Sequence, residues 1–136
     1  MSDRLVVIVP GLPQPQGSSR AFVRGGKPVI TSDNPRLASW RMDVAHCAQA
    51  AMREAHLTAP LVGPVRVAVR FALPKPQRTR RQHPTVRPDV DKLARAVLDA
   101  LTLASVWVDD AQVVILVAQK AYDPVASTYI EVSGLG

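Results

Sequence analysis

The 136-residue sequence is poor in several kinds of residue, and each shortage excludes a class of protein. Cys47 is its single cysteine, so no disulfide can form within the chain and a reducing cytoplasm is the expected compartment. No apolar run approaches the roughly 20 residues that a membrane-spanning helix needs. The apolar run in RLVVIVP, residues 4–10, is also too short for the core of a signal peptide. The composition therefore indicates neither a secreted disulfide scaffold nor a membrane protein.

Acidic residues are also scarce. The chain has 11 Asp and Glu against 17 Lys and Arg, a net charge of +6, which favours an anionic partner and nucleic acid over a membrane surface. With 47% hydrophobic and 21% charged residues, the composition is that of an ordinary globular protein. We therefore expect a single domain over residues 1–136, with a real hydrophobic core and a nucleic-acid partner.

The hydrophobic pattern predicts six strands. They are expected over 4–10, over both arms of a hairpin at 20–31 that turns at Gly25 and Gly26, and over 127–133. Residues 65–73, VRVAVRFAL, alternate cleanly and predict a strand with one buried face. Residues 111–119, AQVVILVAQ, are apolar on both faces, which predicts an interior strand.

Two helices are expected between these strands. The first lies within 33–56, with Asn34 as its N-cap and Pro35 at the first helical position. The second covers about thirteen residues from Asp91 and carries a narrow apolar stripe. The order β-β-β-α-β-α-β-β predicts an α+β, or mixed α/β, fold in which one mixed sheet of four to five strands packs against two helices.

Five of the eleven acidic residues are aspartates within residues 86–114. Asp89 and Asp91 are two apart, and in an extended segment their carboxylates point to the same side. A third carboxylate could come from Asp109 or Asp110 at the entrance of the last apolar run, and adjacent strand residues face opposite ways, so one of the two is expected to join. Carboxylate ligands of this kind suit Mg²⁺ or Mn²⁺.

Each acid also has a structural interpretation. Asp89 could cap the second helix, and Asp91 could interact favourably with the helix dipole. Asp109 and Asp110 could be no more than the polar entrance of a strand. Asp99 lies two turns beyond Asp91, ~12 Å along a helix, which is too far to share one ion. We interpret Asp99 as structural, paired with Arg95 four residues earlier.

A strongly basic loop lies directly upstream of the acids. A cluster of carboxylates repels a phosphate backbone, so a nuclease needs cations nearby to hold DNA and metal to neutralise the site. A run of charges could also be no more than solvated surface. Because this loop lies beside the acids, we favour a role in DNA binding. The candidate DNA-binding residues are Lys75, Arg78, Arg80, Arg81 and Arg87.

The segment RPDVDKLARAVLDALTLASVWVDDAQVV, residues 87–114, resembles the signature of the RusA family of Holliday-junction resolvases. The shared features are Asp-x-Asp, a basic residue on the following helix, Asp-Ala-Leu, and an aromatic residue shortly before Asp-Asp-x-Gln-Val. The resemblance implies a Mg²⁺-dependent homodimeric endonuclease that cuts four-way DNA junctions in recombination and repair. It implies that Asp89, Asp91 and Asp110 bind the metal.

The sequence departs from that signature at two positions. Arg95 stands where the family's helix lysine falls, and Lys92 stands where an asparagine is usual. Both keep or add positive charge, so Lys92 joins the candidate DNA-binding residues and Arg95 the catalytic ones. The alternative from another functional class is a protein that binds branched DNA without cutting it. Metal-dependent nicking of a synthetic junction would separate the two.

Overall fold

A computed structural model describes residues 4–17, 19–32 and 34–136 of the chain. The predicted order of strands and helices is confirmed, with one short 3₁₀ turn added before the fifth strand. The elements are β1 (Arg4–Pro10), β2 (Ser19–Arg24), β3 (Lys27–Ser32), α1 (Leu37–Glu54), β4 (Val65–Leu73), α2 (Val90–Leu103), η1 (Asp110–Gln112), β5 (Val113–Tyr122) and β6 (Ser127–Gly134).

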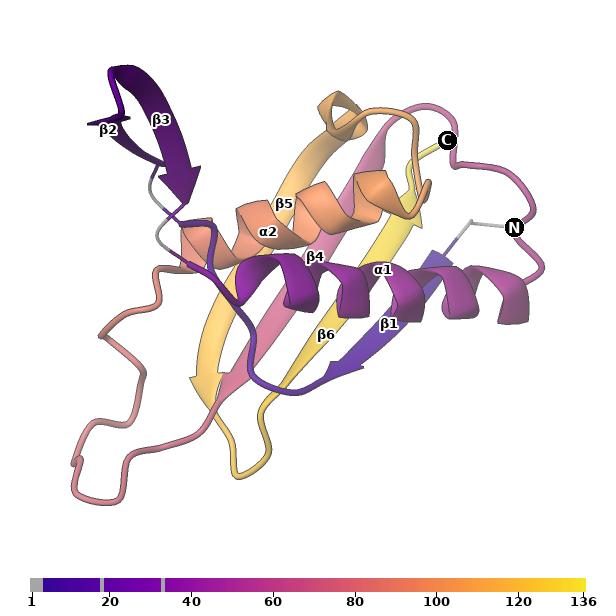
Figure 1. Cartoon of the computed structure of the whole chain (residues 1–136). Coiled ribbons are helices and arrows are strands. Elements are labelled where there is room, and N and C mark those ends of the chain that lie inside the picture. The colour runs from indigo at the N-terminus through magenta and orange to yellow at the C-terminus, as the bar shows by residue number, and fades with distance from the viewer. Residues whose placement is uncertain (1–3, 18, 33) are drawn as a thin grey trace.

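Four strands form one mixed sheet in the order β1-β6-β4-β5. β6 is antiparallel to both β1 and β4, whereas β4 and β5 run parallel. A parallel pair needs a crossover connection, and α2 with its flanking loops supplies it. Both helices lie on the same face of the sheet (Figure 1). The fold is therefore an α+β domain of two layers, as predicted.

The core lies between the sheet and the two helices. The expected inward face of β4 is fully buried, with Val67 and Phe71 at 0% exposure. The predicted apolar stripe of α2 is also buried, from Leu93 through Val97 to Leu101. Among the described residues, no helix combines the length and the apolar character that crossing a bilayer requires.

The start of α1 differs from the prediction. Asn34 is not the N-cap, because the helix begins at Leu37 and Arg36 takes the cap position without a side-chain bond. The Asn34 side chain instead accepts a hydrogen bond from the Arg36 backbone N–H at 3.2 Å and donates one to the Pro15 carbonyl at 2.7 Å. An Asx turn thus replaces the expected cap, since this side chain can bond the backbone two residues on as readily as a helix end.

Strands β2 and β3 form a separate two-stranded hairpin that stands away from the main sheet (Figure 1). Its turn residues Gly25 and Gly26 have φ angles of 61° and 78°. Two successive positive φ angles are what a type I′ turn requires, and glycine adopts them without steric cost. The turn predicted from the glycine pair is therefore confirmed.

The prediction that 111–119 is an interior strand is wrong. β5 is at the edge of the sheet, with β4 as its neighbour. Its central residues, Val114 to Val117, are 43–61% exposed. The apolar pattern on both faces had suggested neighbours on both sides, but α2 covers the inner face of β5 only in part.

Candidate active site and DNA-binding surface

Asp89 and Asp91 lie at the start of α2. Asp89 is the residue before the helix, with extended backbone (φ −75°, ψ 138°), and Asp91 is in the first turn. Asp89 occupies the N-cap position and its carbonyl accepts from the Leu93 N–H at 3.1 Å, but its side chain makes no capping hydrogen bond. Its nearest charged partner is Lys92, whose Nζ lies 4.0 Å from a carboxylate oxygen. Both acids are exposed, so their oxygens face solvent at the positive end of the helix.

Asp109 and Asp110 make different contacts, although neither lies in a strand as the alternation argument assumed, since both belong to the 3₁₀ turn η1 and its cap. The Asp109 carboxylate accepts a hydrogen bond from the Ala111 N–H at 2.9 Å and, with Gln112, forms a capping box on η1. The Asp110 side chain takes no part in this capping box. It lies 3.7 Å from an Arg95 guanidinium nitrogen. Asp109 therefore shapes the turn, and Asp110 faces α2.

Arg95 contacts acidic residues on two different elements. Its guanidinium contacts Asp110 on η1 and also Asp99 on its own helix, at 3.4 Å. Asp99 is bound from the other side by Arg41 of α1, at 3.7 Å. The structural pairing predicted for Asp99 is thus confirmed, and Arg95 lies between that pair and the candidate ligand Asp110.

The structure does not gather the three predicted ligands into a ready metal centre. Within the described ranges, no group of three His, Cys, Asp or Glu side chains lies close enough to hold an ion. The donor chemistry nevertheless suits a hard divalent cation, because all three candidates, Asp89, Asp91 and Asp110, are carboxylates. Asp110 would have to exchange its contact with Arg95 for the ion. The three side chains therefore suit such a cation by their chemistry, although this structure does not bring them together.

The basic loop between β4 and α2 extends away from the body of the protein (Figure 1). Lys75, Arg78, Arg80 and Arg87 are exposed along it. Arg81 is half-buried, and its Nε donates to the Tyr122 hydroxyl at 3.3 Å. Four of the five predicted cations are thus presented to solvent, while Arg81 attaches the loop to the end of β5.

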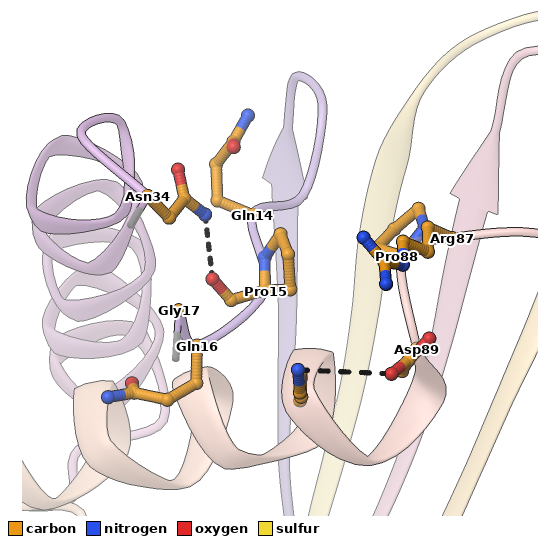
Figure 2. Close-up of a pocket in the computed structure, with 9 residues that line it drawn as sticks. Gln14, Pro15, Gln16, Gly17, Asn34, Arg87, Pro88 and Asp89 are labelled. Carbon is orange, nitrogen blue, oxygen red and sulfur yellow. Dashed lines mark hydrogen bonds and ion pairs between the residues drawn. The ribbon is translucent and has the colours of Figure 1, made fainter. Parts of the chain in front are cut away.

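A cavity of about 510 Å³ opens beside Asp89 (Figure 2). Asp89 and the Arg87–Pro88 segment lie on one side of it, and Gln14, Gln16 and Asn34 lie on the other. The loop carrying the glutamines is bound to α2, because the Gln16 N–H donates to the Lys92 carbonyl at 2.9 Å.

Comparison with known proteins supplies the deciding observation. The family model of endodeoxyribonuclease RusA matches residues 10–133. The crossover junction endodeoxyribonucleases RusA of Escherichia coli strain K12 and of Enterobacteria phage 82 are each 33% identical to this chain. Both alignments span 104 residues, 76% of this chain and 73% of the relative. The chain belongs to the RusA family. It is accordingly an endodeoxyribonuclease, a hydrolase of DNA, as the resemblance implied.

The glutamine of the RusA motif Asp-Asp-x-Gln-Val has a clear structural task here. The Gln112 amide nitrogen donates to the carbonyls of Leu61 and Gly63, each at 3.0 Å. Its oxygen accepts from the backbone N–H groups of Val108 and Asp109, at 3.0 and 3.2 Å. The Gln112 side chain therefore holds the turn that carries Asp110. The sequence had not predicted this role for Gln112.

Lys120 is a second residue that sequence reasoning missed. Its Nζ donates to the Val86 carbonyl at 3.0 Å and to the Pro88 carbonyl at 2.9 Å. Asp89 follows directly, so this lysine of β5 attaches the segment before the RusA Asp-x-Asp pair to the sheet. The sequence offered one hint of this role, because Lys120 is the one charged residue between Asp110 and Asp123.

Cys47 has no place in the candidate site. Its side chain is partly buried and packs against the core, as predicted for this face of α1. Burial, and to a lesser degree the neighbouring Asp43 carboxylate, raises the pKa of the Cys47 thiol. A raised pKa leaves less of the reactive thiolate, which agrees with a packing role in this RusA-family chain.

Proposed function

We propose that this chain is a divalent-metal-dependent resolvase that cuts four-way DNA junctions by paired symmetric nicks in recombination and repair. The match to endodeoxyribonuclease RusA over nearly the whole domain carries the proposal. The relatives bear the name crossover junction endodeoxyribonuclease, and the strongly basic loop beside the acids gives this chain a surface for DNA. A homodimer acting in the cytoplasm is the form we propose.

Asp89, Asp91 and Asp110 would hold the cation, with Mg²⁺ as the first choice and Mn²⁺ as a substitute. When bound, such an ion supplies positive charge for the transition state and acidifies the attacking water. The chain supplies the rest. Lys75, Arg78, Arg80, Arg81, Arg87 and Lys92 would bind backbone phosphates without reading bases.

Arg95 would stabilise charge on the phosphate. It contacts Asp110 and is 60% exposed, so it can reach a phosphate that approaches the same carboxylate. A guanidinium keeps its proton at any working pH, so Arg95 acts as a fixed positive charge and cannot serve as a proton donor. Preorganised charge of this kind typically contributes 10²–10³ in rate, on the order of one oxyanion-hole donor.

The test is single-turnover cleavage of a synthetic four-way junction with Mg²⁺, with linear duplex of the same sequence as the control substrate. Asp89→Asn, Asp91→Asn and Asp110→Asn should each abolish cleavage while junction binding is retained or strengthened, because each removes a negative charge next to phosphates. Asp109→Asn should reduce cleavage less, since Asp109 caps a turn. A fully active Asp91→Asn enzyme would refute the metal assignment, and binding without cleavage by the parent would favour the non-catalytic alternative.

A further inference from the structure

Asp99, the aspartate of the Asp-Ala-Leu motif, lies in α2 between two arginines. Its Oδ1 is 3.4 Å from the Nε of Arg95, and its Oδ2 is 3.7 Å from an Nη of Arg41 on α1. Each carboxylate oxygen therefore has its own guanidinium, and Arg41 does not compete with Arg95 for the same atom. The Asp99 side chain is 24% exposed, so these contacts are partly shielded from water.

The stability of α2 does not account for an aspartate at position 99. An arginine that precedes an acid by four residues is the weaker order for a pair on a helix. Acids stabilise the N-terminal end of a helix, whereas Asp99 lies in the C-terminal half of α2. Partly exposed ion pairs also add little to the stability of a fold. The contact of Asp99 with Arg95 is thus better explained by what it does to Arg95.

Arg95 is a long side chain that needs to be held in place. Its side chain is 60% exposed, and an exposed arginine samples many rotamers. Nε contacts Asp99, whereas Nη1 lies 3.7 Å from the Asp110 carboxylate. Two different nitrogens make the two contacts, so the guanidinium lies between a carboxylate of its own helix and one of η1. The contact with Asp99 therefore restricts the direction in which Arg95 points.

The two carboxylates that contact Arg95 differ in their relation to the candidate site. Asp110 is a candidate metal ligand, and a cation held by it would repel a guanidinium at the same oxygens. Asp99 lies two turns beyond Asp91, ~12 Å along the helix, which places it outside the candidate ligands. Asp99 can therefore keep its contact with Arg95 while Asp110 exchanges its own.

We propose that Asp99 is a positioning residue for Arg95, holding the guanidinium beside the site when Asp110 exchanges that contact for a metal ion. If Asp99 is removed, Asp110 is the ion-pair partner left to Arg95 among the described residues. Arg95 would then pair more fully with Asp110 and compete with the ion. The inference rests on the proposed function, because it takes Asp110 as a metal ligand.

The test measures Mn²⁺ binding to the free protein by electron paramagnetic resonance, without DNA. Arg95→Gln should bind Mn²⁺ about threefold more tightly than the parent, since it removes the cation that competes for Asp110. Asp99→Asn should bind Mn²⁺ about threefold more weakly, since Arg95 then pairs with Asp110 alone. Asp99→Glu, which retains the carboxylate, should restore most of the affinity.

A double variant separates positioning from a simple loss of charge. Asp99→Asn removes a negative charge, which by itself weakens cation binding at long range. If Asp99 acts through Arg95, the combination of Arg95→Gln with Asp99→Asn should bind Mn²⁺ as tightly as Arg95→Gln alone. A long-range charge effect would instead weaken binding by the same factor with and without Arg95.

Two further variants serve as controls. Glu54→Gln removes an acid at the last residue of α1, ~20 Å along that helix from Arg41, and should bind Mn²⁺ like the parent. Asp110→Asn should lose the Mn²⁺ binding that responds to Arg95. Circular dichroism checks that each variant is folded.

The outcomes distinguish this role from the proposed function. The positioning role is overturned if Asp99→Asn weakens Mn²⁺ binding equally in both backgrounds, or if the parent shows no Mn²⁺ binding that Asp110→Asn removes. A parent that follows the predicted pattern but cuts no junction would refute the proposed function and leave the role of Asp99 standing. A parent that cuts junctions, with equal Asp99→Asn effects in both backgrounds, would do the reverse.

Discussion

Arg95 stands where a lysine is expected from the family resemblance. Its contacts suggest two substitutions that test whether its positive charge matters for cleavage. It lies between Asp99 and Asp110 at 3.4 and 3.7 Å. Arg95→Lys should keep much of the cleavage rate, and Arg95→Ala should lose on the order of 10²–10³. Single-turnover nicking at saturating Mg²⁺, with junction binding measured separately, gives the comparison.

Arg41→Ala is the matched control for that experiment. Arg41 contacts the same Asp99 from α1, at 3.7 Å, whereas the contact with Asp110 is made by Arg95. If the loss in Arg95→Ala comes only from disturbing Asp99, Arg41→Ala will show a similar loss. An Arg95→Ala enzyme that cuts as fast as the parent would show that this helix face takes no part in catalysis.

Lys120 permits a prediction about positioning. Its two hydrogen bonds carry a full charge, and bonds of that kind contribute about 1.5–3 kcal/mol. Lys120→Met keeps the length of the side chain but removes both donors to Val86 and Pro88. The segment that holds Asp89 should loosen, so the variant should need about tenfold more Mg²⁺ for half-maximal cleavage.

A role limited to stability would give a different result. In that case Lys120→Met would unfold at a lower temperature while its Mg²⁺ requirement stayed that of the parent. Lys120→Arg, which retains a donor at similar reach, should restore part of the metal affinity. An unchanged Mg²⁺ titration of a folded Lys120→Met protein would remove Lys120 from the candidate site.

The basic loop is the element with the clearest expected effect on DNA binding. Arg78 and Arg80 are both exposed, whereas Arg81 also attaches the loop to Tyr122. Arg78→Ala combined with Arg80→Ala therefore removes charge without releasing that attachment. Each lost phosphate contact should flatten the log–log salt dependence of junction binding by about 0.9.

Arg53→Ala serves as the control for the loop, since Arg53 is an exposed cation in the last turn of α1. Its salt dependence should be that of the parent. If the Arg78 and Arg80 double variant keeps both the affinity and the salt slope, the loop is solvated surface and DNA is bound elsewhere.

At the scale of the whole molecule, the arrangement of layers explains where the charges and apolar surfaces lie. Two helices cover one face of the sheet, and the basic loop and the β2–β3 hairpin extend from the body of the domain (Figure 1). The candidate site lies where α2 begins and where η1 approaches it through Arg95. One end of α2 and the turn before β5 therefore carry the candidate acidic residues of this domain.

The sequence by itself determined the elements, the core and the family. Periodicity identified the buried stripe of α2 at Leu93, Val97 and Leu101, because a helix packed on one face must repeat its apolar residues at helical spacing. The glycine pair at 25–26 identified the hairpin turn, since the conformation there is local. The motif at 87–114 identified the family, because several residues at fixed spacing are specific.

Only the tertiary structure decided which residues meet across long stretches of chain. The bonds of Lys120 to Val86 and Pro88 span more than thirty residues, and no periodicity encodes such a contact. The edge position of β5 was likewise hidden. An apolar pattern on both faces suggests that a strand has neighbours on both sides, but it does not say which strands lie beside it. That choice depends on strand order, which is fixed by how the whole domain packs.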